Sequence, residues 1–217
     1  MSQDVDLRSL SVADGNEKQA YELFGDGNPP KSTRDKLVYR AMDLFFSYGY
    51  HAVGIDRIIS DVGVTKTTFH NHFDSKDDLI IETIRLRDQW ENEVFQRRLL
   101  ERSGGDARAM ILGYFDVLDE YFNDENFKRC QFLNACAEFP SRHDPVHQEA
   151  AKHYINGEAF LRQAAERLGV DDPDDLARWL IILIEGALTR RLVTGDNAAA
   201  LAARDIAAMV VDRAAKS

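Results

Sequence analysis

Residues Ile55–Phe73 read IDRIISDVGVTKTTFHNHF, and this stretch decides the fold. Its apolar residues up to Val62 recur on one face of a helix, which we expect to end at Gly63, because glycine readily takes the left-handed conformation of a helix terminus. Thr65 then begins a second, very short helix. A helix, a glycine and a short helix give the spacing of a helix-turn-helix, whose second helix lies in the major groove of DNA.

Three apolar side chains of this stretch, Ile58, Val64 and Phe69, would close a small core between the helices. That packing leaves short polar donors outside, which suit phosphates and base edges. The outward-facing residues are Lys66, Thr67, Thr68, His70, Asn71 and His72. The pattern alone leaves one alternative open, a solvated turn in a helical bundle.

The flanking sequence is helical on both sides. A stripe of apolar residues from Leu37 to Tyr48 predicts a helix that Thr33 caps and Gly49 ends. Ser75 and Asp78, three residues apart, are typical of the capping arrangement at the start of a long helix. Further helices follow, one of them over about 125–139 before Pro140 and a last, alanine-rich one over about 197–215. No segment alternates like a strand, so we predict an all-α protein with about nine helices.

Charge is distributed unevenly over the 217 residues, whose formal net charge is −10. Residues 31–76 hold seven basic and five acidic side chains, so this segment alone is locally positive and suited to a polyanion. We therefore expect an acidic, disordered tail over 1–30, a helix-turn-helix DNA-binding domain over 31–76, and a larger helical domain over 77–217.

Neither a membrane span nor a secretory signal is predicted. The longest apolar stretch, around Leu180–Ile184, is far shorter than the roughly 20 residues that cross a bilayer. The acidic start lacks the basic and apolar regions of a signal peptide, so we expect a cytoplasmic protein. Cys130 and Cys136 match no zinc or redox spacing, and we interpret them as buried free thiols.

Several segments together resemble the N-terminal domain of TetR-family transcriptional regulators. They are Gly49-Tyr50, Ile55–Ile59, Val62–Phe73 and Ser75–Leu79. The resemblance implies a three-helix DNA-binding domain and a long fourth helix, and it makes the helical domain over 77–217 one for effector binding and dimerisation. It further implies a homodimer that binds double-stranded DNA at a palindromic operator, as a repressor that a small molecule releases. The run Leu183–Leu188 is similar to the penultimate helix of many members.

The resemblance also assigns residues to DNA binding. Lys66 and Thr67 fall where the family touches bases or phosphates, and Lys76 where it contacts the DNA backbone. His70 stands where the family usually has a phosphate-binding tyrosine, and Gly54 where a threonine or serine usually begins the second helix. The full candidate set is Gly54, Thr65, Lys66, Thr67, Thr68, His70, Asn71, His72 and Lys76.

Polar side chains on otherwise apolar helices of the larger domain are candidates for an effector pocket, because a ligand can supply the partners that they need. They are Tyr114, Asn134, Glu138, His153, Asn156 and Glu185. Each has an ordinary structural alternative. For the aromatic stripe this is core packing, and for Glu185 an ion pair with Arg190 or Arg191.

A metal site and an enzyme are both disfavoured. His143, Asp144, His147 and His153 are metal-ligand types, but their spacing is not diagnostic and Asp144 precedes a proline as helix caps do, so we predict no metal and no cofactor. Nucleophile-elbow, zinc-protease and nucleotide-binding motifs are absent. Two alternatives to a regulator stay open: a helical interaction or oligomerisation module, and an all-α enzyme built on Glu138, His153 and Glu185.

Small side chains on the last two helices predict the dimer interface, because they let helices approach closely. Gly186, Ala187 and the alanines of 198–208 are the residues concerned.

Overall fold

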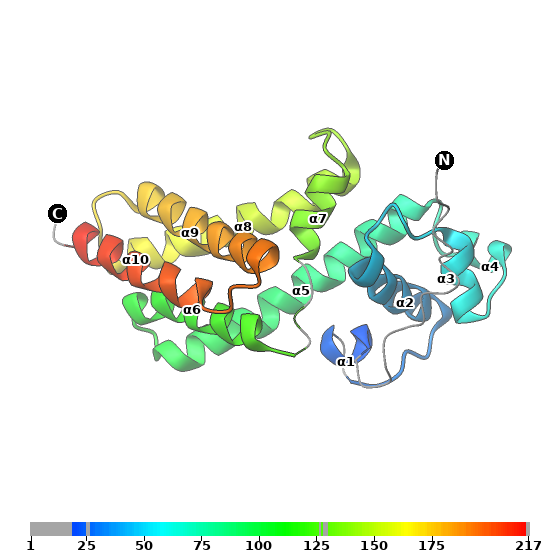
Figure 1. The fold of residues 1–217 in the computed structure, drawn as a ribbon, viewed down its shortest axis with the longest axis horizontal. Coiled ribbons are helices and arrows are strands. Elements are labelled where there is room, and N and C mark those ends of the chain that lie inside the picture. The colour runs from blue at the N-terminus through cyan, green and yellow to red at the C-terminus, as the bar shows by residue number, and fades with distance from the viewer. Residues whose placement is uncertain (1–18, 25–26, 126, 128–129, 216–217) are drawn as a thin grey trace.

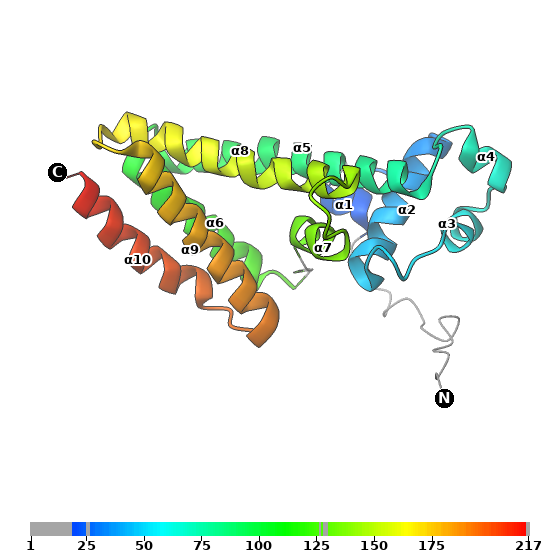
Figure 2. The same cartoon turned by 90° about the horizontal axis from the view of Figure 1, so that it is seen from above.

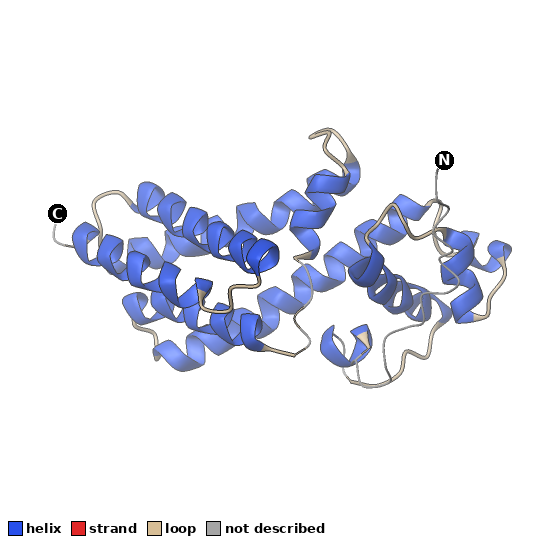
Figure 3. Ribbon diagram, in the orientation of Figure 1, coloured by secondary structure: helices blue, strands red, loops and turns tan. Residues whose placement is uncertain are grey.

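The computed structural model describes residues 19–24, 27–125, 127 and 130–215, and within them the chain forms ten helices and no strand (Figure 3). The all-α prediction is confirmed. The helices are α1 (Ala20–Phe24), α2 (Thr33–Tyr48), α3 (Ile55–Val62), α4 (Lys66–His70), α5 (Lys76–Ser103), α6 (Ala107–Asn123), α7 (Gln131–Glu138), α8 (Pro145–Leu168), α9 (Pro173–Thr194) and α10 (Ala199–Ala214).

The molecule is elongated, with α2, α3 and α4 at one end and α6, α9 and α10 at the other (Figure 1). The long helix α5 joins the two ends, and α8 runs beside it (Figure 2). Helix α7 lies between the small end and the bundle (Figures 1 and 2). This position makes α7 a bridge between the two parts.

Local sequence signals set most helix ends. The N-cap of α2 is Ser32 and not the expected Thr33. The Ser32 side chain accepts a hydrogen bond from the Asp35 amide, and Thr33 is the first residue of the helix. Gly49 ends α2 with a φ of 85°, which only glycine adopts readily. Ser75 and Asp78 form the predicted capping box of α5, each side chain accepting from the backbone amide of the other.

Two large clusters of buried residues form most of the core, and a third, small one joins Ala20 of α1 to Met42 and Phe46 of α2. The larger cluster lies among α5, α6, α8, α9 and α10. The smaller one lies in α2–α4 but also takes in Leu79 and Ile84 from α5, Phe132 and Ala135 from α7, and Val146 from α8. Residues of the larger domain thus pack into the core of the DNA-binding domain, across the domain boundary that we expected after residue 76.

Two elements differ from the predicted ones. The expected tail over 1–30 contains the short helix α1, whose Ala20 is buried against α2 and donates its amide to Asp43 Oδ1; residues 1–18 of that tail lie outside the described part. Helix α7 begins at Gln131, not near residue 125. Helix α6 ends at Asn123, whose side-chain amide donates to the Asp119 carbonyl at 2.9 Å.

Candidate DNA-binding face and effector pocket

The α3–α4 unit has the geometry of the predicted helix-turn-helix. Gly63 ends α3 in the left-handed conformation, with a φ of 76°, and donates its amide to the Ile59 carbonyl. Thr65 caps α4 by accepting from the Thr68 amide at 3.1 Å. The side chains of Ile58 and Phe69 are fully buried beneath the turn, and this fixes the orientation of α4.

The outer face of α4 is free of tertiary cover. Thr67, His70, Asn71 and His72 are all exposed. The Lys66 side chain is 64% exposed and faces Asp56 at 3.8 Å, a long contact between two solvated groups that contributes little. Thr65, the N-cap residue, and Gly54, at the start of α3, are exposed too, whereas Thr68 is half-buried. These side chains form one polar face, which we call the α4 face.

Lys76 differs from the expectation that it is available to the DNA backbone. Its ammonium group donates to the Tyr50 carbonyl at 2.6 Å and is half-buried. Burial lowers the pKa of Lys76, and the charges of Asp77 and Glu138 oppose this shift. In this arrangement Lys76 fixes the loop between α2 and α3.

Glu138, which we expected in the effector pocket, is not among the residues that line the pocket described below, and it is the second residue that fixes this loop. Its carboxylate accepts the amide of Tyr50 at 3.0 Å and the amide of His51 at 2.7 Å. The His51 ring contacts the Glu138 carbonyl at 2.8 Å. A Cβ atom on Gly49 would lie 2.8 Å from Glu138 Oε1, so glycine permits the close approach. We call this set of contacts the α7 latch.

A pocket opens among α5, α6, α7, α8 and α9, and three of the predicted residues line it: Tyr114, His153 and Glu185. Asn156 lines a smaller adjoining space, and Asn134 lines neither. Other lining side chains were not predicted, because only packing brings them together. They are Arg87, Glu91, Phe95, Tyr121, Cys130, Gln131, Phe132 and Tyr154.

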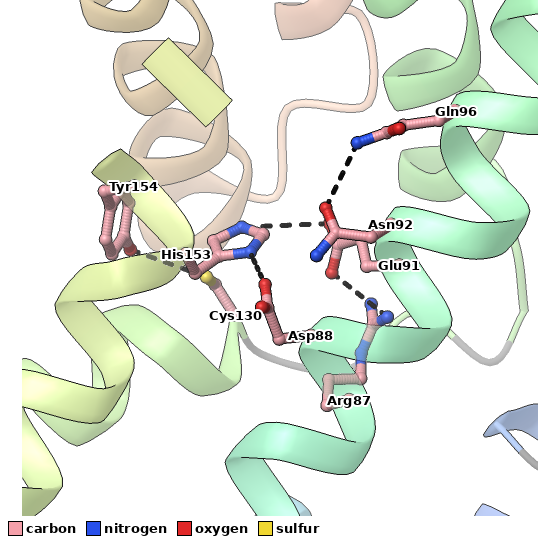
Figure 4. A network of polar contacts seen from close by, with 8 residues as sticks. All are labelled: Arg87, Asp88, Glu91, Asn92, Gln96, Cys130, His153 and Tyr154. Atoms are coloured by element: carbon pink, nitrogen blue, oxygen red, sulfur yellow. Dashed lines mark hydrogen bonds and ion pairs between the residues drawn. The ribbon is translucent and has the colours of Figure 1, made fainter. Parts of the chain in front are cut away.

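Polar side chains of the pocket wall form a network (Figure 4). His153 meets Asp88 Oδ1 at 2.8 Å through Nδ1 and stacks on Phe132 with 3.7 Å between ring centroids. Arg87 is buried and pairs with Glu91 at 3.0 Å. These contacts engage the Arg87 guanidinium and the His153 ring with carboxylates of α5.

Glu185 has no such partner. Arg190 pairs with Asp196 at 2.9 Å and Arg191 donates to the Phe122 carbonyl at 3.1 Å, so the ion pairs considered for Glu185 do not form. Burial, followed by the charge of Glu158, raises the pKa of Glu185. Within the part of the chain that the structure describes, the pocket therefore carries one carboxyl group, that of Glu185, without an ion-pair partner.

Both cysteines are free and half-buried thiols. Burial raises the pKa of Cys130, which lies 3.8 Å from the Tyr154 hydroxyl. Burial likewise raises the pKa of Tyr121, to about 12. Both groups stay protonated at neutral pH and line the pocket as neutral side chains.

Two family models match the chain. The model of bacterial regulatory proteins of the TetR family matches residues 37–83, and the model of the Tetracyclin repressor-like C-terminal domain matches residues 107–207. The chain belongs to the TetR family. TetR-family members are helix-turn-helix transcriptional regulators that bind DNA and respond to ligands, and this chain is accordingly a regulator and not an enzyme.

Known relatives support this placement. The HTH-type transcriptional regulator YjdC of Escherichia coli is 23% identical over 165 residues, which are 76% of this chain and 86% of YjdC. A TetR-type regulator from Streptomyces avermitilis superimposes with a TM-score of 0.74 at 28% identity, over 85% of this chain and 98% of that chain. A TetR-family regulator from Streptomyces coelicolor has a TM-score of 0.75 at 24% identity, over 84% and 95%.

The described part of this TetR-family chain holds no cluster of three or more metal-ligand side chains. His143 is exposed and His147 bonds to the Phe139 carbonyl at 2.7 Å, so each has an ordinary structural place. Within the same residues, every helix is too short or too polar to cross a membrane.

Proposed function

We propose that this protein is a dimeric transcriptional repressor that binds a palindromic operator through the α4 face and leaves it when a small molecule fills the pocket. The observation that carries the proposal is the exposure of Lys66 and Thr67 above a fully buried Phe69. Because its target is chromosomal DNA, we place the protein in the cytoplasm.

The α4 face supplies the kinds of groups that DNA recognition needs. Lys66 provides a charge that can displace a cation from a phosphate. Thr67 and Asn71 provide hydroxyl and amide groups for base edges or phosphates. His70 and His72 add ring nitrogens from the same short helix and its end. Gly54, Thr65 and Thr68 complete the proposed contact set, whereas Lys76 acts by holding the loop.

The dimer contact that we propose is the outer face of α9 and α10. Large apolar side chains are exposed there: Trp179 (46%), Ile182 (56%) and Val193 (75%) on α9, and Ile206 (49%) and Met209 (72%) on α10. On α9 they recur at helical spacing with the exposed Gly186 between them. A patch of this kind is characteristic of an interface, and a second copy would cover it with the same patch.

Coupling between pocket and DNA runs through α7 in this proposal. The first residues of α7, Gln131 and Phe132, line the pocket. Its last residue, Glu138, holds the loop that precedes α3. The pocket has a volume of about 50 Å³, well below the roughly 300–1,000 Å³ of ligand sites. An effector must therefore part the walls, and a shift of α7 would reach α3 and α4.

The effector acts by favouring one arrangement of the dimer. Half-sites of a palindromic operator lie about one helical turn, roughly 34 Å, apart. A ligand shifts the equilibrium only by its differential affinity for the two arrangements. An expanded pocket in which the two α4 helices no longer match that spacing would bind the effector and release DNA.

Capture of DNA by the full-length protein tests this function. A fragment from upstream of its own gene is compared with an unrelated fragment of equal length, and transcription from that promoter is followed in vitro. We expect specific retention and lower transcription. Equal retention of both fragments would contradict the operator proposal, and higher transcription would contradict repression.

A further inference from the structure

One buried hydrogen-bond acceptor among the pocket-lining residues, the side-chain oxygen of Gln131, has no donor among the residues that the structure describes. Gln131 is only 4% exposed, and its Oε1 atom accepts no hydrogen bond from the residues that the structure describes. A buried acceptor without a donor costs free energy, so its presence calls for a ligand that donates.

The contacts of the neighbouring Thr83 show that the oxygen, and not the nitrogen, of the Gln131 side-chain amide lacks a hydrogen-bond partner. The Thr83 hydroxyl donates to the Ile80 carbonyl at 2.7 Å, so its oxygen can only accept from Gln131. The Gln131 amide nitrogen donates to that oxygen at 3.3 Å. Turning the amide over would place two acceptors together, and therefore Oε1 is the atom of this lining residue that lacks a donor.

The charged side chains of the pocket wall determine whether a cationic or an anionic ligand is favoured. Arg87 is committed to Glu91, and its guanidinium also lies over the Trp90 ring at 4.7 Å. His153 is committed to Asp88. Among the described residues of the wall, Glu185 alone offers a carboxyl group without an ion-pair partner, so a cationic ligand would find a partner there and an anionic one would meet repulsion.

Aromatic rings occupy much of the remaining wall. Phe95 and Tyr114 pack edge to face at 4.4 Å, and Tyr121 and Tyr154 line the same pocket. Ring faces attract cations and cover flat apolar groups. Phe95 and Tyr121 also line an adjoining groove of about 400 Å³ beside α5 and α6, which gives space for a ligand body larger than the pocket.

We infer that the effector is a protonated amine on a flat, aromatic body, with its N–H groups directed to Gln131 Oε1 and the Glu185 carboxylate and its rings between Phe95 and Tyr121. The inference rests on the proposed function, because it names the ligand class of the same pocket. It excludes organic acids as effectors.

Three probes with one ring system and three charges test the inference: 2-naphthylmethylamine, 2-naphthylmethanol and 2-naphthoic acid. Binding of each to the full-length protein is measured by calorimetry. We expect the amine to bind at least about tenfold more tightly than the alcohol and the acid. Failure of the amine to bind at millimolar concentration, or an acid that binds as tightly, would overturn the inference.

Variants then assign the selectivity to the named groups. Glu185→Gln keeps the size of the side chain and should remove the preference for the amine over the alcohol. Glu101→Gln makes the same change at an exposed position near the end of α5, outside the pocket, and should leave the preference unchanged. Gln131→Leu should weaken the amine and the alcohol together, because both donate to Oε1. A preference for the amine that survives Glu185→Gln would contradict the proposed charge contact.

Promoter DNA separates this inference from the proposed function. If the amine binds as described but the promoter fragment is never retained, the ligand class stands and the operator function fails. If the acid and not the amine releases a retained promoter fragment, the operator function stands and the ligand class fails.

Discussion

The Tyr50 hydroxyl donates a hydrogen bond to the backbone carbonyl of Gln131 at 3.2 Å, across 81 positions of sequence. Tyr50 precedes α3 in the DNA-binding end, and the side chain of Gln131 lines the pocket. Tyr50 is 1% exposed, and burial raises its pKa far above the usual value, so the hydroxyl stays protonated and able to donate. One buried contact thus joins the loop before α3 to the pocket wall.

The α7 latch predicts that Glu138→Gln loosens this junction. The amide side chain offers one carbonyl oxygen where the carboxylate accepts two backbone amides, so one of the two amides loses its partner. We expect a loss of about 1–3 kcal/mol in the free energy of unfolding. Hydrogen exchange of the Tyr50 and His51 amides should speed up more than exchange in α9. Unchanged exchange at both amides would show that the latch does not hold the loop.

Gly49 predicts a second test of the latch. Gly49→Ala introduces a side chain at a φ of 85° and places its Cβ 2.8 Å from Glu138 Oε1. Gly169→Ala is the matched control, since Gly169 has a φ of 76° but no atom within 4 Å of an added Cβ. Both should destabilise by about 1–3 kcal/mol through backbone strain. In urea denaturation Gly49→Ala should cost clearly more, and equal costs would mean that Glu138 moves aside freely.

The apolar face of α9 predicts the oligomeric state. Ile182→Glu places a charge in the proposed interface and should turn a dimer into a monomer at micromolar concentration, as measured by light scattering. Leu100→Glu makes the same change at a side chain that is 50% exposed on α5, away from α9 and α10. The control should stay dimeric. A wild-type protein that is monomeric, or an Ile182→Glu dimer, would contradict the assigned interface.

Glu185 predicts a pH-dependent stability. Its pKa in the folded protein is raised by burial and by Glu158. Below the pKa that Glu185 has in the unfolded chain, the carboxyl is protonated in both states and does not change the free energy of folding. As the pH rises above that pKa, the unfolded chain releases the proton first, and this opposes folding. Glu185→Gln should therefore raise the melting temperature at pH 7 and lose that advantage below about pH 4. A constant difference across this range would contradict a raised pKa.

Local signals in the sequence were enough to predict the DNA-binding end. Gly63, the Thr65 cap and the Ser75–Asp78 capping box each depend on residues only a few positions apart. The buried positions of Ile58 and Phe69 followed from helical spacing. Such features are local, so pattern and cap chemistry determine them.

Local signals predicted only three of the residues that line the pocket and none of the contacts of the latch. Glu138 lies 88 positions from Tyr50, and its pairing with backbone amides leaves no mark on the sequence. Arg87 and Gln131 enter the pocket because α5 and α7 pack together, and Lys76 turns inward because the loop carbonyl needs a donor. Tertiary packing, and not residue type, decided these roles.

The salt dependence of operator binding by Lys66→Ala tests the central claim most directly. Affinity of the wild-type protein for its own promoter fragment is measured over a range of salt concentrations, beside Lys66→Ala and the control Lys152→Ala on α8. If the α4 face binds DNA, Lys66→Ala weakens binding and lowers the slope of log affinity against log salt by about one unit, whereas Lys152→Ala changes neither. An unchanged affinity and slope for Lys66→Ala would contradict the claim that this face meets DNA.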